Sequence, residues 1–426
     1  MKVPNFTFWF IIIVFVIGGL AIYVYEHFRY SPFALQVDFE VVKEYIYDRH
    51  VECYNPNFRN KFRTRNVQFN SRMTPYQFAM NVAPVLSELN DGTTRIEIPI
   101  RRVDKILPLK FKYIDNEVFV YETNCEIPEG SKIISINGEP IDTILERYAK
   151  LYPNLSEFEA KYAFVEKLLT YYLKIIDANS IQIVYKSPQS SVQKTTYLKG
   201  IEKFQEKRNI IDLIKLDESL VVKINSFKIS SKEDMQYVAQ KMEEIAGESS
   251  DSSITIFDLR YASDGDETIP LAIISMLISQ PEKLYQELYV RYRDHLVKKD
   301  QIPIQPDENQ LPGKVYFLVD KTCLYTPHKV LLSFFAKSGE KNNNVTIISS
   351  DNEYNFPNVF YVDEIVKILP NTKAHLIIPT GKVLANDIPD IQINEDLKLT
   401  CEELINLDSY RIYSEKIAKI IENIGR

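Results

Sequence analysis

The chain is poor in glycine and shows no concentration of basic residues. Only 12 of its 426 residues are Gly, whereas 27 are Tyr and 23 are Phe. This aromatic content, within a chain that is 45% hydrophobic, argues against extensive disorder. The net charge is -7 and the acidic and basic residues are interspersed, so no basic stripe or arm is present. Nucleic acid is therefore not expected as a partner.

Cysteine is also scarce. The four cysteines, Cys53, Cys125, Cys323 and Cys401, lie far apart and form no CxxC pair. A zinc site is therefore not expected, and neither is any other metal or a cofactor. An oxidising compartment would allow up to two disulfides, but the spacing does not say which cysteines would pair.

One long hydrophobic run stands at the N-terminus. Phe6 to Tyr25 (FTFWFIIIVFVIGGLAIYVY) is uncharged and, as a helix, would span about 30 Å, the thickness of a bilayer's hydrocarbon core. A cleaved signal peptide would have a shorter apolar region and a small-residue cleavage site, which YVYEHFRY does not supply. We therefore predict an uncleaved anchor and a single-pass membrane protein. The flanking charges give little indication of orientation, and the main domain is expected on the extracytoplasmic side.

The remaining chain divides by pattern into four further parts. After the anchor (1–29), apolar residues three and four apart predict a helical region at 30–94. Alternating residues predict strands at 95–150, and a helical and strand connector follows at 151–208. From 209 to 426, strands such as SLVVKINSF, SSITIFDLR and KVYFLVD alternate with helices. That alternation predicts an α/β core with a largely parallel sheet, whose ligands would bind at the carboxyl ends of the strands.

Several segments in this order resemble the tail-specific, or C-terminal processing, serine peptidases, a group that includes the tricorn core protease and interphotoreceptor retinoid-binding protein. The segments are LSELNDGTTRIEI (86–98), EGSKIISINGEPIDTIL (129–145), ITIFDLRYASDGD (254–266) and KVYFLVDKTCLYTPHKVLL (314–332). The resemblance implies a helical N-terminal region, a PDZ-like module at 95–150 and a ClpP/crotonase-like core at 209–426. It also implies a nucleophilic serine in the turn after the KVYFLVD-type strand.

The catalytic positions implied by the resemblance carry other residues here. The nucleophile position reads Tyr325, and a phenol with a pKa near 10 on a rigid ring is a poor acyl acceptor. The histidine of the Asp-Gly-His-Thr segment reads Thr93, which cannot act as a general base near pH 7. The oxyanion loop, which the amide of Thr326 would complete, reads Ser263, Asp264 and Gly265, and a carboxylate there would repel a developing oxyanion. We therefore expect the serine peptidase chemistry to be lost.

Three nearby residues are candidates for a relocated chemistry. Thr326 offers a hydroxyl with His328 two residues on, but a Thr-Pro pair is typical of a helix N-cap, and residues two apart on a helix point in different directions. Cys323 is the third candidate, but no base accompanies it, which favours a small buried residue over an activated thiolate.

Three hypotheses follow for the function. The first is an inactive pseudopeptidase that binds a peptide or protein tail in the former active-site cleft by strand addition, with a small hydrophobic molecule as a further ligand class. The second is an active serine-type endopeptidase that uses Thr326. The third is a scaffold subunit whose cleft is filled.

Overall fold

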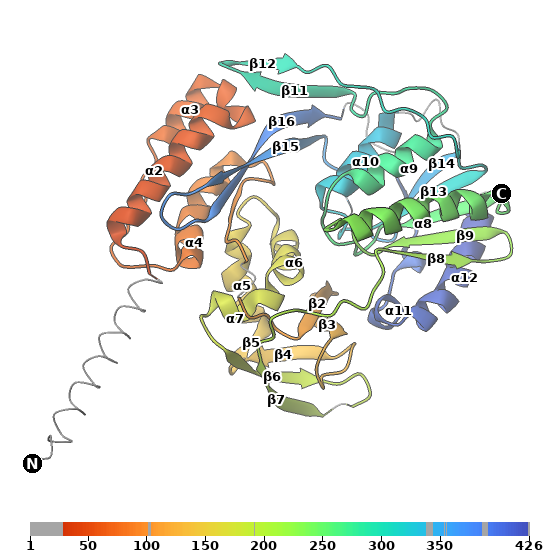
Figure 1. Cartoon of the computed structure of the whole chain (residues 1–426), viewed down its shortest axis with the longest axis horizontal. Coiled ribbons are helices and arrows are strands. Elements are labelled where there is room, and N and C mark those ends of the chain that lie inside the picture. The colour runs from red at the N-terminus through yellow and green to blue at the C-terminus, as the bar shows by residue number, and fades with distance from the viewer. Residues whose placement is uncertain are drawn as a thin grey trace, which may run out of the picture.

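The computed structural model describes residues 29–100, 104–190, 192–337, 344–352, 354, 356–385 and 391–424. Within these ranges the protein is mixed α/β, with three separate sheets (Figure 1). The helices are α2 (Pro32–Arg49), η1 (Val51–Tyr54), α3 (Pro56–Arg63), α4 (Pro75–Leu86), η2 (Ser87–Leu89), α5 (Ile141–Tyr148), η3 (Ala149–Leu151), α6 (Glu157–Lys167), η4 (Leu169–Tyr171), α7 (Tyr172–Ile175), α8 (Lys232–Ser250), α9 (Thr268–Leu277), α10 (Thr326–Lys337), η5 (Glu395–Leu397), α11 (Cys401–Ile405) and α12 (Leu407–Ile424).

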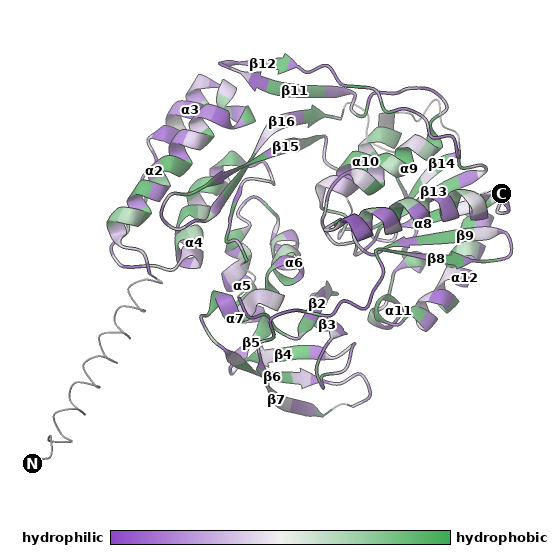
Figure 2. Ribbon diagram, viewed as in Figure 1, coloured by the Kyte–Doolittle hydropathy of each residue, from purple (hydrophilic) through white to green (hydrophobic). Residues whose placement is uncertain are grey.

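The central sheet is parallel apart from one edge. Its strands, in spatial order, are β17 (Ile391–Ile393), β14 (Val345–Ser349), β13 (Lys314–Val319), β10 (Ile254–Asp258), β9 (Ser219–Ile224) and β8 (Ile211–Lys215). Only β8 runs antiparallel to its neighbour. Helices cover both faces, with α8, α9 and α10 on one and α12 on the other (Figure 1). Because both faces are buried, strands such as β9 are mostly hydrophobic (Figure 2).

A second sheet is antiparallel and lies beside the central one. It contains β2 (Leu109–Ile114), β3 (Glu117–Thr123), β4 (Lys132–Ile136), β6 (Ser180–Lys186) and β7 (Gln193–Lys199), with the short β5 (Glu139–Pro140) paired to β4. This sheet therefore joins strands of the segment predicted as a PDZ-like module to two strands of the predicted connector.

Helix α6 packs on the second sheet and carries several residues of the candidate site. Its start is encoded locally by a capping box: the Ser156 hydroxyl accepts from the Glu159 N–H (3.4 Å), and the Glu159 carboxylate accepts from the Ser156 N–H (2.8 Å). At the penultimate residue of the helix, Glu166 accepts from Lys112 of β2 (2.7 Å). The end of α6 is thereby fixed to the edge of the second sheet.

The third sheet crosses above the other two (Figure 1). It contains β1 (Arg95–Glu97), β16 (His375–Leu384), β11 (Glu287–Tyr292) and β12 (His295–Lys298), in that order. A fifth strand, β15 (Val359–Ile368), pairs along its whole length with β16, on the side opposite to β1 and β11. Among the described strands, β16 is the one partner of β15, so the other edge of β15 is unpaired.

The predicted fold class needs a correction. Across the part of the chain that the structure describes, no helix is long and apolar enough to cross a membrane. The apolar α9 has only 10 residues, and the longer α8 carries charged residues along its length. The run from Phe6 to Tyr25 lies outside the described residues. The predicted transmembrane anchor and the single-pass, extracytoplasmic location are therefore not supported by the structure.

Candidate functional site

The loop between β13 and α10 carries the nucleophile position and is fixed by a buried carboxylate. The Asp320 carboxylate accepts from the N–H (2.9 Å) and the hydroxyl (2.5 Å) of Thr322. The Thr322 hydroxyl accepts in turn from the Tyr261 N–H (2.9 Å), which connects this loop to the one after β10. Burial raises the pKa of Asp320 to about 6.

Tyr325, at the position where the resemblance places the nucleophile, carries a buried ring. Its side chain is 8% exposed, and its ring centroid lies 6.1 Å from those of Tyr162 and His328. The Lys167 ammonium lies 4.9 Å from the centre of the Tyr325 ring. Burial raises the pKa of the Tyr325 phenol well above its ordinary value, so the group is an uncharged phenol and not a phenolate nucleophile.

The loop after β10 carries an ion pair where the resemblance places an oxyanion hole. Lys167 donates to the Asp264 carboxylate (2.5 Å). Burial alone would raise the pKa of Asp264, but the charge and hydrogen bond of Lys167, the Arg95 charge and the Gly265 N–H together outweigh it, and the pKa lies below its ordinary value. Gly265 is required by packing, because a Cβ at that position would lie 2.0 Å from the backbone of Phe227. Ser263 bonds through its backbone to Asn225 and Phe227, which holds the loop against the end of β9.

A buried arginine, Arg260, holds the start of the same loop to the end of β10. Arg260 donates to both oxygens of Asp258, at 2.7 Å and 2.6 Å. The Tyr410 hydroxyl on α12 donates to the same carboxylate (2.7 Å). Burial would raise the pKa of Asp258, but Arg260, Lys223 and the Tyr410 hydroxyl together outweigh it and hold the pKa low. This pair is fully buried and fixes the end of β10.

The segment with Thr93 is organised by a residue that sequence reasoning missed. The Asp91 carboxylate accepts from the N–H of Thr93 (2.7 Å) and lies 2.6 Å from Nε2 of His50, and both acid and imidazole are buried. Nδ1 of His50 accepts from the Glu52 N–H (3.1 Å), so both ring nitrogens are occupied. Because 41 residues separate His50 from Asp91, no local spacing signals the pair.

Arg95 connects the three parts of the site. Its guanidinium donates to the Thr93 carbonyl (2.9 Å) and pairs with Glu97 (2.7 Å) and Glu364 (3.2 Å). The same charge acts on the pKa values of Asp264 and Tyr325. The structure thus brings the segments of Thr93, Asp264 and Tyr325 near one another, although they come from the segment before β1, the loop after β10 and the loop after β13.

Within the part of the chain that the structure describes, none of the three relocated candidates is hydrogen-bonded to a side chain that could act as a base. Helix α10 begins at Thr326, whose hydroxyl makes no hydrogen bond to a described residue. Burial lowers the pKa of His328 to about 4, and its Nε2 lies 3.1 Å from the Leu259 carbonyl, so the imidazole is neutral and donates to the backbone. Burial raises the pKa of the Cys323 thiol well above its ordinary value. His328 and Cys323 are therefore buried structural groups.

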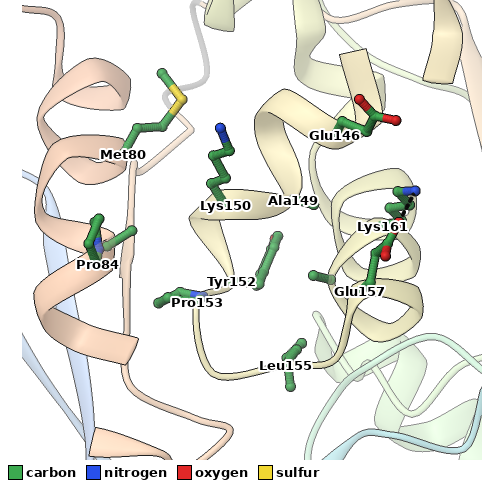
Figure 3. Close-up of a pocket in the computed structure, with 12 residues that line it drawn as sticks. Met80, Pro84, Glu146, Ala149, Lys150, Tyr152, Pro153, Leu155, Glu157 and Lys161 are labelled. Carbon is green, nitrogen blue, oxygen red and sulfur yellow. Dashed lines mark hydrogen bonds and ion pairs between the residues drawn. The ribbon is translucent and has the colours of Figure 1, made fainter. Parts of the chain in front are cut away.

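A pocket of about 390 Å³ opens between α4, η3 and α6 (Figure 3). Its walls are mostly apolar, with Met80 and Pro84 on the α4 side and Pro153 and Leu155 on the other. Tyr152 lines it as well and is close enough to Tyr325 to affect the pKa of that phenol.

The described ranges contain neither a candidate metal site nor a disulfide bond. No group of three or more His, Cys, Asp or Glu residues there could hold a metal ion. Cys53, Cys125, Cys323 and Cys401 are all free thiols in the structure.

Comparison with known proteins places the fold. No family model and no curated protein matches the chain. Among solved structures, mature CPAF in complex with lactacystin is similar over 92% of this chain and 98% of that one, at 12% identity and a TM-score of 0.53. A protein assigned as an S41 protease from Bacteroides fragilis is similar over 90% and 97%, at 12% identity and a TM-score of 0.51. A photosystem II D1 C-terminal processing protease is similar over 87% of this chain and 97% of its own, at 13% identity and a TM-score of 0.47.

The chain therefore has the S41 peptidase fold. The predicted resemblance to the tail-specific, C-terminal processing peptidases is confirmed at the level of that fold.

Proposed function

We propose that this protein is a catalytically inactive member of the S41 peptidase fold that binds an extended peptide or protein segment. The observation that carries the proposal is Tyr325, a buried, uncharged phenol at the position of the nucleophile. Its ring is held from three sides by Tyr162, Lys167 and His328, so it cannot leave without loss of packing.

The surroundings of Tyr325 support the loss of chemistry independently. Amide donors aimed at a developing oxyanion stabilise acyl transfer, whereas here the loop presents the Asp264 carboxylate, paired to Lys167. His50 is not available as a base, because Asp91 and the Glu52 N–H occupy its two nitrogens. Thr326 has no base within hydrogen-bond distance among the described residues, which leaves the alternative of an active endopeptidase without support.

The free edge of β15 supports peptide binding. Val366 and Ile368 on this strand are 53% and 57% exposed. Val366 and Arg95 both pair with Ile377 of β16, so the three side chains share one face of the sheet. That face leads from the edge of β15 to the Arg95–Glu364 pair and the candidate site. An extended segment added to β15 would gain backbone hydrogen bonds and apolar contacts, and would need no reactive group.

Peptide binding is tested by fluorescence anisotropy with a library of labelled extended peptides. We expect binding to wild type and its loss in Val366→Glu and Ile368→Glu, because a buried carboxylate on the binding face is costly. Val297→Glu is the matched control, since Val297 is an exposed valine (44%) on β12, at the opposite edge of the third sheet from β15. Equal binding by all three variants would contradict the assignment to β15.

The packing of Tyr325 also favours a second candidate, a scaffold subunit with a filled cleft. The same ring that removes the nucleophile occupies the space beside Tyr162. If no peptide of the library binds, and the protein forms a stable complex with another chain, the scaffold function is favoured over peptide binding.

A further inference from the structure

A groove lined by methionines lies between α8 and α9, two neighbouring helices on one face of the central sheet (Figure 1). Its volume is about 300 Å³. Three of the chain's six methionines line it, namely Met235 and Met242 on α8 and Met276 on α9. Met242 and Met276 are buried, whereas Met235 is 47% exposed. The groove therefore presents apolar surface to solvent.

Helical spacing brings the lining residues of each helix onto one side. On α8 the apolar lining residues follow the spacing i, i+3, i+4 and i+7, and they are Met235, Val238, Ala239 and Met242. On α9 the spacing is i, i+4 and i+8, and the residues are Thr268, Ala272 and Met276. Residues spaced in this way form a stripe along a helix, so two stripes face each other across the groove.

The loop with Asp307 and Asn309 bounds the groove at the end of α9. The Asp307 N–H donates to the Ser275 carbonyl (2.8 Å), and the Leu311 N–H donates to the Met276 carbonyl (2.8 Å). These two backbone hydrogen bonds hold the loop to the last turn of α9. The groove thus has three walls, formed by α8, α9 and this loop.

The shape of the groove favours a helix as its occupant. Hydrogen bonds within α8 and α9 use the backbone groups of their central turns, so an extended segment could not pair with them as it could with a sheet edge. A third helix fits, because its side-chain ridges pack between two neighbouring helices. The stripe from Thr268 to Met276 is about 12 Å long, which matches about two turns of a partner helix.

The charged residues that line the groove, Glu243 and Asp307, are both acidic. Within the described ranges, neither carboxylate forms an ion pair, and Asp307 accepts only from the Asn309 N–H (2.8 Å). Lys241 of α8 is paired with Glu244 (2.6 Å) and does not line the groove. Opposite charges across an interface favour association, so these carboxylates select a partner with cationic side chains beside its apolar face.

We infer that the groove between α8 and α9 binds a basic amphipathic helix of a partner protein. The apolar side chains of that helix lie between the methionines, and its Lys or Arg side chains lie beside Glu243 and Asp307. Methionine is flexible and polarisable, so these walls adapt to apolar side chains of different shapes. The groove is on the central sheet, whereas the proposed peptide-binding edge is β15 of the third sheet. The inference goes beyond the proposed peptide binding and does not depend on it.

Methyl NMR of the full chain, with isotope-labelled methionine methyl groups, tests the location of the site. The probe is an amphipathic peptide of about 14 residues made of Leu, Ala and Lys, with Leu on one face. We expect the signals of Met235, Met242 and Met276 to shift on titration, and those of Met73 and Met80 to stay unchanged. Met80 lines the pocket beside α4 and so reports unspecific apolar binding. Unshifted groove signals, or equal shifts of all five, would overturn the inference.

Variants in the same titration test the apolar and the charged contacts. Met235→Lys places a cation in the groove and should weaken binding of the peptide by about tenfold or more. Ile412→Lys is the matched control, because Ile412 is 71% exposed on α12 and does not line the groove. Equal binding by the two variants would contradict the assignment of the groove.

A twin peptide with Glu in place of Lys tests the preference for a basic partner. It should bind wild type about tenfold more weakly than the basic peptide, and the double variant Glu243→Lys/Asp307→Lys should reverse this order. Equal binding of both peptides by wild type would overturn the basic character of the partner. Shifts of the groove signals with protein concentration, in the absence of peptide, would assign the groove to a second copy of this chain and overturn the inference.

Discussion

Tyr325→Ser introduces an alcohol at the position where the sequence resemblance places the nucleophile, and we expect it to destabilise the protein without creating activity. The substitution removes a ring that is 92% buried and packed against Tyr162 and His328. Deleting a buried aromatic ring typically costs about 3–5 kcal/mol. Loss of the Lys167 contact with the ring adds about 0.5 kcal/mol. The free energy of unfolding should therefore fall by about 4 kcal/mol.

Urea unfolding and cleavage of a quenched fluorogenic peptide library measure the two consequences of Tyr325→Ser. Cleavage should stay at the level of a buffer blank, because Thr93 supplies no base and Asp264 opposes the oxyanion. Tyr197→Ser is the control: that side chain is 73% exposed, so its unfolding free energy should change by less than about 0.5 kcal/mol. A Tyr325→Ser protein that is as stable as wild type, or that cleaves peptide, would refute the reasoning.

Three further predictions concern the loops around Tyr325. Gly265→Ala should lower the unfolding temperature strongly or prevent folding, because the added Cβ would overlap the Phe227 backbone. An unchanged unfolding temperature would disprove the close approach of Gly265 to that backbone. The pKa of His328 is about 4 when folded and about 6.5 when unfolded, so the unfolded chain takes up its proton first. As the pH falls from 7 to 4, the free energy of unfolding of wild type, measured by urea titration, should therefore fall by up to about 3 kcal/mol more than that of His328→Gln. If the two proteins lose stability in parallel, the imidazole is not buried and neutral. Lys167→Met should lower the free energy of unfolding by about 1 kcal/mol, because it leaves Asp264 unpaired. The double variant Lys167→Met/Asp264→Asn should recover part of this loss. If the losses of the two single substitutions simply add, the pair is not coupled.

The strands around the site are predictable because local pattern determines them. The runs SLVVKI, ITIFD and KVYFLV are mostly apolar, as expected for strands covered on both faces, and they form β9, β10 and β13. The carboxyl ends of parallel strands lie at the same edge of the sheet. The loops with Asp264 and Tyr325, which follow β10 and β13, could therefore be expected to lie close together.

The polar partners of the site could not be predicted, because they come from distant parts of the chain. Lys167 reaches Asp264 across 97 residues, and His50 reaches Asp91 across 41. Neither pair has a spacing that a helix or strand would impose. The burial of Tyr325 depends on α6, whose position against α10 is set by tertiary packing and not by the sequence around residue 325.

Covalent labelling with a fluorophosphonate probe, followed by mass-spectrometric mapping of residues 322–328, tests the central claim most directly. If Tyr325 has replaced the nucleophile and nothing has taken over its role, the purified protein carries no label in this peptide. Labelling at 322–328 that disappears in Thr326→Ala would show a working nucleophile one residue further on, and would contradict the claim.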